Sequence, residues 1–173
     1  MRILEPDMCV ERLSDIDCNY WYGKGIRCVL VDLDNTISPW AKVEITDDAK
    51  AFIEKSKNAG VMVVLFSNAT EGRVREAAWN AGINYYASAR KPFPFRYKKA
   101  IAELSFCNTQ ILTIGDQVFT DVLGGNLTGC ATILVAPLSE AEYVGTKFLR
   151  ILERMIVRRK IVFQDELYPS GNE

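Results

Sequence analysis

Five short segments that lack charged residues, separated by stretches with helical periodicity, are the feature that most constrains how this chain can fold. They span residues 26–31 (apart from Arg27), 61–66, 85–87, 110–114 and 131–135, and the run VMVVLF at 61–66 has no polar interruption. Strands that are buried on both faces of a parallel sheet have this continuous apolar pattern, and the helices between them cover the two faces. The sequence therefore predicts an α/β fold, a Rossmann-like three-layer sandwich with a mainly parallel five-stranded sheet and no cap domain.

Capping residues and helical periodicity predict the helices that alternate with these strands. Thr46 precedes two acids and is expected to cap a helix that ends near Gly60, and a second helix should run from 71 to 81 before Gly82. Further helices are expected from Pro92 or Pro94 to about 105, over 121–126, and over 140–160. We expect one domain over 1–173, with 1–25 as an N-terminal extension and 161–173 as a tail that could be flexible.

Composition excludes several kinds of chemistry. The chain has 173 residues, no His, a net charge of −1 and 49% hydrophobic residues, so it has the make-up of an ordinary globular protein. Without His, neither a His-based catalytic triad nor a His metal site can form. The near-neutral charge gives no general attraction to nucleic acid. No apolar run reaches the length of a membrane span, so a cytoplasmic location is expected.

Polar side chains follow four of the predicted strands at the point where each strand ends. The first is followed by Asp32 and Asp34, and the later strands by Ser67, Lys91 and Asp116. Because the carboxyl ends of parallel strands meet at one edge of a sheet, these groups should lie close together. Several carboxylates at one place repel each other unless a cation joins them, and Mg²⁺ prefers oxygen ligands of this kind. The sequence thus predicts a Mg²⁺ site that also accepts a phosphoryl group.

Each of these residues, taken alone, could have a purely structural role. The DxDxT segment at 32–36 could be a turn, Ser67 and Asp121 could cap helices, and Arg90 competes with Lys91 as a phosphate contact. A phospho-acceptor receiver domain also combines Asp, hydroxyl and Lys residues. In receiver domains, however, the metal-binding acids precede the acceptor Asp, whereas here DxDxT comes first. The joint order therefore favours phosphoryl transfer, with one Asp attacking phosphorus and the other moving the proton.

The order DLDNT, S-N, K-P and GDQxxxD resembles that of the haloacid dehalogenase-like (HAD) phosphatases. The segments LEPDMCVERLSDID, GIRCVLVDLDNT and GDQVFTDVLGGNLTG are similar to the YqeG-type branch, subfamily IIIA, whose relatives in mitochondria and plastids resemble phosphatidylglycerophosphate phosphatases.

The resemblance assigns a role to each motif residue. It implies that Asp32 is the nucleophile and a Mg²⁺ ligand, and that Asp34 is the general acid and base, with its backbone carbonyl on the metal. It implies that Asp116 is a further ligand and that Asp121, the less certain member of the metal-binding set, lies behind the ligands or binds the metal through water. The phosphate side of the site is assigned to Thr36, Ser67, Asn68 and Lys91.

The spacing of the motifs bears on the substrate. Cap domains of this family enter on either side of Ser67, but only 33 residues separate it from Asp34 and 24 from Lys91. The core elements occupy both intervals, so an open site is expected, which suits a large substrate or a phosphate at a lipid surface.

The predicted last helix supplies a second clue to the substrate. Residues 147–160 contain six Lys or Arg and one Glu. A basic amphipathic helix can lie on anionic lipid, or it can pack on the sheet with its basic face in water.

Three functions of different class follow. The first is a Mg²⁺-dependent phosphatidylglycerophosphate phosphatase that works through an aspartyl-phosphate, peripheral to the inner face of a membrane. The second is a soluble phosphatase for a protein, nucleotide or sugar phosphate, and the third is a non-catalytic binding module. The expected partners are a phosphomonoester and anionic phospholipid, with no nucleic acid.

Overall fold

The computed structural model describes residues 3–139, within which six parallel strands form one sheet. The order across the sheet is β1-β6-β5-β2-β3-β4. The strands are β1 (Met8–Val10), β2 (Cys28–Val31), β3 (Met62–Phe66), β4 (Asn84–Tyr86), β5 (Ile111–Gly115) and β6 (Ala131–Val135). The predicted parallel α/β architecture is confirmed, and the five predicted strands are all present, with ends shifted by two residues at most.

The prediction of five strands was wrong by one, because β1 lies inside the N-terminal segment that was taken for an extension. β1 is only three residues long, and two of them are half-buried, so it leaves no continuous apolar run. It pairs with β6, with Met8 opposite Ile133. The Asp7 carboxylate fixes this register, because Asp7 Oδ2 accepts a hydrogen bond from the backbone N–H of Thr132 at 2.8 Å.

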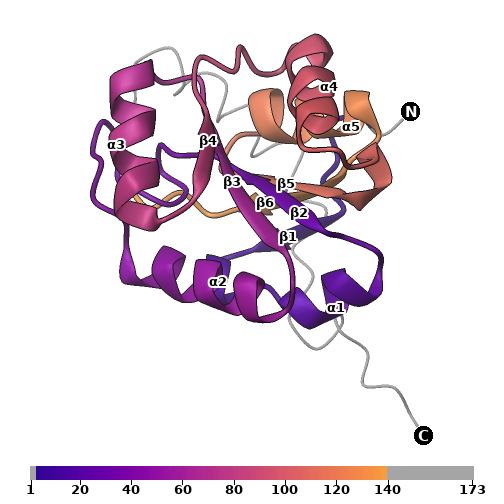
Figure 1. The fold of residues 1–173 in the computed structure, drawn as a ribbon, viewed down its shortest axis with the longest axis horizontal. Helices are drawn as coiled ribbons and strands as arrows, with labels where there is room; N and C mark the ends of the chain where they lie inside the picture. The colour runs from indigo at the N-terminus through magenta and orange to yellow at the C-terminus, as the bar shows by residue number, and fades with distance from the viewer. Residues whose placement is uncertain (1–2, 140–173) are drawn as a thin grey trace, which may run out of the picture.

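Helices cover both faces of the sheet, as a three-layer sandwich requires. The helices are α1 (Cys18–Gly23), α2 (Asp47–Asn58), α3 (Glu71–Ala81), α4 (Pro94–Glu103) and α5 (Leu123–Thr128). Alternate residues of β2 face opposite layers: Val29 and Val31 pack in the cluster of α1, α2 and α3, whereas Leu30 packs in that of α4. Figure 1 shows α1 and α2 on one side of the strands and α4 and α5 on the other.

Capping explains where the longer helices begin and end. Thr46 Oγ1 accepts a hydrogen bond from the N–H of Ala49 at 3.2 Å, and the acids of the first turn of α2 suit the helix dipole. α3 ends at Gly82, whose φ of +65° a residue with a side chain rarely adopts. Both helices thus match their predicted ends closely.

The predicted helix over 121–126 begins elsewhere. A π-helical turn, Val118–Val122, leads into α5, so Asp121 lies inside the turn and does not cap a helix. π-Turns inside helices are often found at functional sites.

The chain order places β2 at the switch point of the sheet. β2 pairs with β3 on one side and with β5 on the other. From β2 the chain moves outward through β3 and β4, then returns to β5 and continues outward to β6. In open parallel sheets, ligands bind beyond the carboxyl ends of the strands at such a point. Asp32 and Asp116 follow the two strands that meet there.

The predicted helix over 140–160, its basic residues 147–160 and the tail 161–173 lie outside the described residues. Within 3–139, no helix is both long enough and apolar enough to cross a membrane.

Candidate active site

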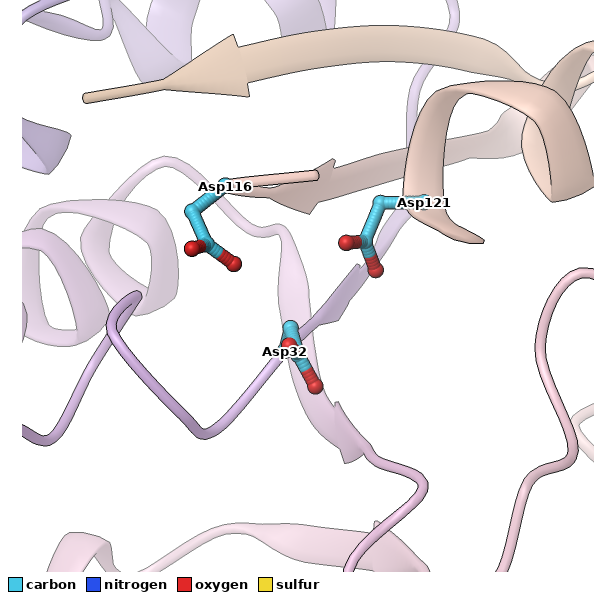
Figure 2. A group of neighbouring side chains, drawn as sticks. All are labelled: Asp32, Asp116 and Asp121. Atoms are coloured by element: carbon cyan, nitrogen blue, oxygen red, sulfur yellow. The ribbon is translucent and has the colours of Figure 1, made fainter. Parts of the chain in front are cut away.

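Three buried carboxylates meet at the carboxyl edge of the sheet and form what we call the acid cluster. It consists of Asp32 after β2, Asp116 after β5 and Asp121 in the π-helical turn. Each contributes an oxygen that lies within 4.8 Å of the other two. Figure 2 shows the three side chains gathered around one space. The structure therefore brings together three of the four predicted metal-ligating residues.

Lys91 supplies the positive charge within the cluster. Its Nζ lies 2.7 Å from Asp32 Oδ1 and 2.6 Å from Asp121 Oδ1, and its side chain is 2% exposed. Three carboxylates with one ammonium group leave an excess of negative charge in a place that water barely reaches. Such an excess is costly unless a further cation joins it.

Burial and the neighbouring charges shift the two central pKa values. Burial raises the pKa of Asp32 from 3.8 to about 6, although the charge of Lys91 acts in the opposite direction. Burial alone would lower the pKa of Lys91, but the charges of Asp121 and Asp32 outweigh it and raise this pKa. Lys91 is therefore firmly cationic, whereas Asp32 gains its full charge only above about pH 6.

The donor set fits a hard divalent cation. All the converging atoms are carboxylate oxygens, which Mg²⁺ prefers, and a divalent charge would neutralise the excess described above. Asp32, Asp116 and Asp121 are the residues that would hold the ion.

Gly115 makes room for the carboxylate of Asp121. A Cβ atom added at this position would overlap the Asp121 carboxyl group. The close approach of Asp121 thus requires the glycine before Asp116. It lets Asp121 reach a cluster whose other acids come from strand ends.

Asn68 holds the backbone of Lys91, although we had expected it to contact the phosphate. Its Oδ1 accepts a hydrogen bond from the N–H of Lys91 at 2.7 Å, and its Nδ2 donates to the Lys91 carbonyl at 3.2 Å. Because both groups of the amide are engaged, Asn68 fixes the loop that carries the lysine.

Ser67 is buried next to Asn68, at the end of β3. Its Oγ accepts a hydrogen bond from the N–H of Ala69 at 3.3 Å, and the N-cap of α3 is Thr70. The alternative that Ser67 caps the helix is therefore excluded.

Asp34 has a different partner from the acid cluster. Arg73 Nη2 donates to Asp34 Oδ1 at 2.6 Å and Nη1 donates to Oδ2 at 3.3 Å, while the N–H of Ala41 lies 3.0 Å from Oδ1. The Asp34 carboxyl group is not among the three converging carboxylates of residues 3–139. A metal contact through its backbone carbonyl stays a prediction.

Sequence reasoning missed Arg73, although the chain carries a signal for it. Arg73 is in the first turn of α3, where the helix dipole disfavours a positive charge. A cation in that position, six residues after Ser67, indicates an anionic partner near the helix start.

Thr36 and Arg90 complete the set of predicted residues. Thr36 is buried, its N–H donates to the carbonyl of Leu33 at 3.3 Å, and its hydroxyl has no hydrogen-bond partner within residues 3–139. This fits a role in the tight loop after Asp32. Arg90, the competing phosphate contact, is exposed at the rim, whereas Lys91 reaches the acids.

The chain matches two family models. Residues 88–137 match the HAD-hydrolase-like family, and residues 1–84 match the mitochondrial PGP phosphatase family.

Two similar full-length proteins are also named as phosphatases. The chain is 33% identical over 152 residues to the "Probable phosphatase YqeG" of Bacillus subtilis, and the alignment covers 88% of each chain. It is 26% identical over 146 residues to "Phosphatidylglycerophosphate phosphatase 1, chloroplastic/mitochondrial" of Arabidopsis thaliana, covering 79% of this chain but only 42% of that protein.

A solved structure supports the fold. The D,D-heptose 1,7-bisphosphate phosphatase of B. bronchiseptica, crystallised with magnesium and phosphate, superposes with a TM-score of 0.50 at 17% identity. The superposition covers 63% of this chain and 80% of that one.

Proposed function

Because the chain belongs to the haloacid dehalogenase-like (HAD) family and is a phosphatase of the YqeG type, we propose that it hydrolyses phosphate monoesters through an aspartyl-phosphate on Asp32. One observation carries this proposal: the Asp32 carboxylate lies at the switch point of the sheet, 2.7 Å from a buried Lys91 and beside two more carboxylates. Such a site attracts a divalent cation and, with it, a phosphoryl group.

The residues divide the reaction between them. A carboxylate oxygen of Asp32 attacks phosphorus, the bond from phosphorus to the ester oxygen breaks, and Asp34 protonates the departing oxygen. Water, deprotonated by Asp34, then attacks the phosphoryl group and frees Asp32 and inorganic phosphate. Lys91 balances the charge of the phosphoryl oxygens, and Asn68 holds it in position. Mg²⁺, when bound, offsets the negative charge of both the acids and the phosphate.

Phosphate release from p-nitrophenyl phosphate tests this proposal. We expect activity with Mg²⁺, none after chelation with EDTA, and none in Asp32→Asn. Activity that persists in Asp32→Asn, or that is indifferent to EDTA, would overturn the assignment of nucleophile or metal.

We propose a lipid phosphate, of the phosphatidylglycerophosphate type, as the substrate, and hence a location at a membrane surface. Two findings support this: residues 1–84 match the PGP phosphatase family, and a relative of that name is 26% identical. The connections between the motifs fit as well. Between Asp34 and Ser67 the structure has only a loop, α2 and β3, and between Ser67 and Lys91 only α3 and β4, so this part of the chain contains no cap domain.

A comparison of substrates tests the lipid assignment. We expect kcat/KM for micellar phosphatidylglycerophosphate to exceed that for glycerol 3-phosphate, nucleotide and sugar phosphates by at least tenfold. Equal or better turnover of a soluble phosphate would favour the second function, a soluble phosphatase, and would sink the lipid proposal.

A further inference from the structure

Two large aromatic side chains project into solvent beside the active site. Phe93 and Phe95 are 57% and 56% exposed, and their ring centroids are 6.2 Å apart. The helix that begins here, α4, buries its apolar side through Tyr97, Ala100 and Ile101, so the two rings play no part in its packing. An exposed apolar feature of this kind indicates an interaction site when other properties agree.

The rings are fixed relative to the phosphate-binding lysine. Phe93 is two residues after Lys91, so their Cα atoms are at most about 7 Å apart. Asn68 holds the backbone of Lys91, and the N–H of Phe93 donates to the carbonyl of Arg90 at 3.0 Å. The rings thus stand at the rim of the site on a segment whose backbone is tied to it.

Positive charge surrounds the rings. Residues 84–102 contain five Lys or Arg and no Asp or Glu. One of the five, Lys91, points into the site. Arg90, Lys98 and Lys99 are exposed, and the guanidinium of Arg96 lies 5.8 Å from the ring centroid of Phe95. Lys99 approaches Glu103 at 3.8 Å, and Arg96 donates to the carbonyl of Ser88 at 3.1 Å. Arg90 and Lys98 form no ion pair within residues 3–139 and are left to bind an external anion.

Apolar rings within a basic surface match the chemistry of an anionic bilayer. Aromatic side chains insert at the boundary between headgroups and acyl chains, and Lys and Arg beside them bind the anionic headgroups. A single-stranded nucleic acid would use the same positive charges and could stack its bases on the rings. Lipid is the occupant favoured here, because the proposed substrate of the adjoining site is a lipid phosphate.

We propose that Phe93 and Phe95, with the basic residues around them, form a lipid-docking rim that inserts into an anionic bilayer and turns the active site toward headgroup phosphates. The inference rests on the proposed lipid substrate and adds the surface that delivers it. Insertion at this rim would place Lys91 close to the headgroups without lifting the lipid out of the membrane.

Vesicle flotation tests the rim, using the full chain with vesicles of phosphatidylglycerol and phosphatidylcholine. We expect Phe93→Ser/Phe95→Ser to bind at least tenfold more weakly than the unchanged protein, and vesicles of phosphatidylcholine alone to bind weakly. The matched control is Trp79→Ser, because Trp79 is 86% exposed but lies near the end of α3 away from the site edge. This control should bind normally.

Three outcomes would overturn the rim. The double variant could bind vesicles as the unchanged protein does, Trp79→Ser could lose as much binding, or gel filtration could show a dimer that only the double variant abolishes. Because residues 147–160 are the same in every variant, differences in binding report on the rim.

A second variant measures directly whether the rim inserts into the bilayer. We expect Phe95→Trp fluorescence to be quenched by brominated lipids well beyond the quenching of the chain's own tryptophans. An absence of additional quenching would contradict insertion.

Hydrolysis of p-nitrophenyl phosphate separates this inference from the proposed function. All rim variants should retain it. If the unchanged protein binds vesicles through the rim but releases no phosphate, the proposed function fails and the rim stands. If it hydrolyses soluble phosphate but the rim variants bind lipid normally, the rim fails alone.

Discussion

The two acids of the DxD segment are two residues apart, yet they lie in different surroundings. Asp32 belongs to the acid cluster, where Lys91 is its cation and its carboxylate is almost inaccessible. Asp34 belongs to the Asp34–Arg73 pair, in which the side chains are 12% and 30% exposed. The comparison shows that the loop after β2 places one carboxylate in the acid cluster and the other beside an arginine. Both carboxylates are buried, so the difference lies in their partners. A carboxylate that shares Lys91 with two further acids suits a nucleophile and metal ligand, whereas Asp34, oriented by Arg73 outside that cluster, is left to move the proton.

Removing the charge of Asp32 tests the role of the acid cluster and should have the largest effect on activity. We expect Asp32→Asn to lower kcat by at least about 10³-fold, because no other group attacks phosphorus.

The same variant should be more stable without metal at pH 7. The pKa of Asp32 in the folded state, about 6, lies above its ordinary value of 3.8. The stability that protonation of Asp32 provides is therefore present below about pH 4 and lost as the pH rises through 6. Asn removes this loss in stability, a gain on the order of 3 kcal/mol at about 1.4 kcal/mol for each pKa unit. Urea melts at pH 7 and pH 4 measure it, and equal or lower stability of the variant at pH 7 would contradict the account.

Gly115→Ala should act on the same cluster with a smaller effect. The added Cβ displaces the Asp121 carboxylate, so we expect Mg²⁺ affinity to fall by about 10- to 100-fold, with activity partly restored at high Mg²⁺. Gly72→Ala is the matched control, since a Cβ there meets no atom within 4 Å. Unchanged Mg²⁺ dependence in Gly115→Ala would show that Asp121 is not a ligand.

Arg73 variants probe the other side of the comparison. Arg73→Met should lower kcat for an alkyl phosphate by about tenfold, because Asp34 loses the partner that orients it, and Arg73→Lys should recover part of the loss. The exposed Arg75, on the same helix, supplies the control Arg75→Met. The Mg²⁺ affinity should not change, and a fall in that affinity would mean that the two regions are not separate.

The pH dependence of metal binding should show the smallest effect. Since the pKa of Asp32 is about 6, a proton competes with the metal below that pH. We expect Mg²⁺ affinity, measured by calorimetry, to be about fourfold weaker at pH 5.5 than at pH 7.5. Asp34→Asn should keep this dependence. A flat profile in the unchanged protein would exclude Asp32 from the metal site.

Sequence predicted the features that depend on local chemistry or on strand order. The apolar runs gave the parallel sheet, Gly82 marked the end of α3, and the polar residues at strand ends gave the acid cluster, because parallel strands must bring those ends together. Sequence reasoning missed β1 because a strand of three residues, of which two are half-buried, shows no periodicity.

Side-chain pairing across the fold was harder to predict. Arg73 forms an ion pair with Asp34, 39 positions earlier in the sequence. Asn68 forms hydrogen bonds with the backbone of Lys91, 23 positions later. Such contacts depend on how loops are placed over the sheet, which no local pattern encodes.

The most direct test of the claim that the two acids act differently is a rapid-mixing measurement of p-nitrophenol release. p-Nitrophenolate leaves without a proton, so Asp34→Asn should give a burst of about one equivalent per site and then stall, because hydrolysis of the aspartyl-phosphate needs the base. Asp32→Asn should give no burst. A burst from Asp32→Asn, or none from Asp34→Asn, would contradict the account.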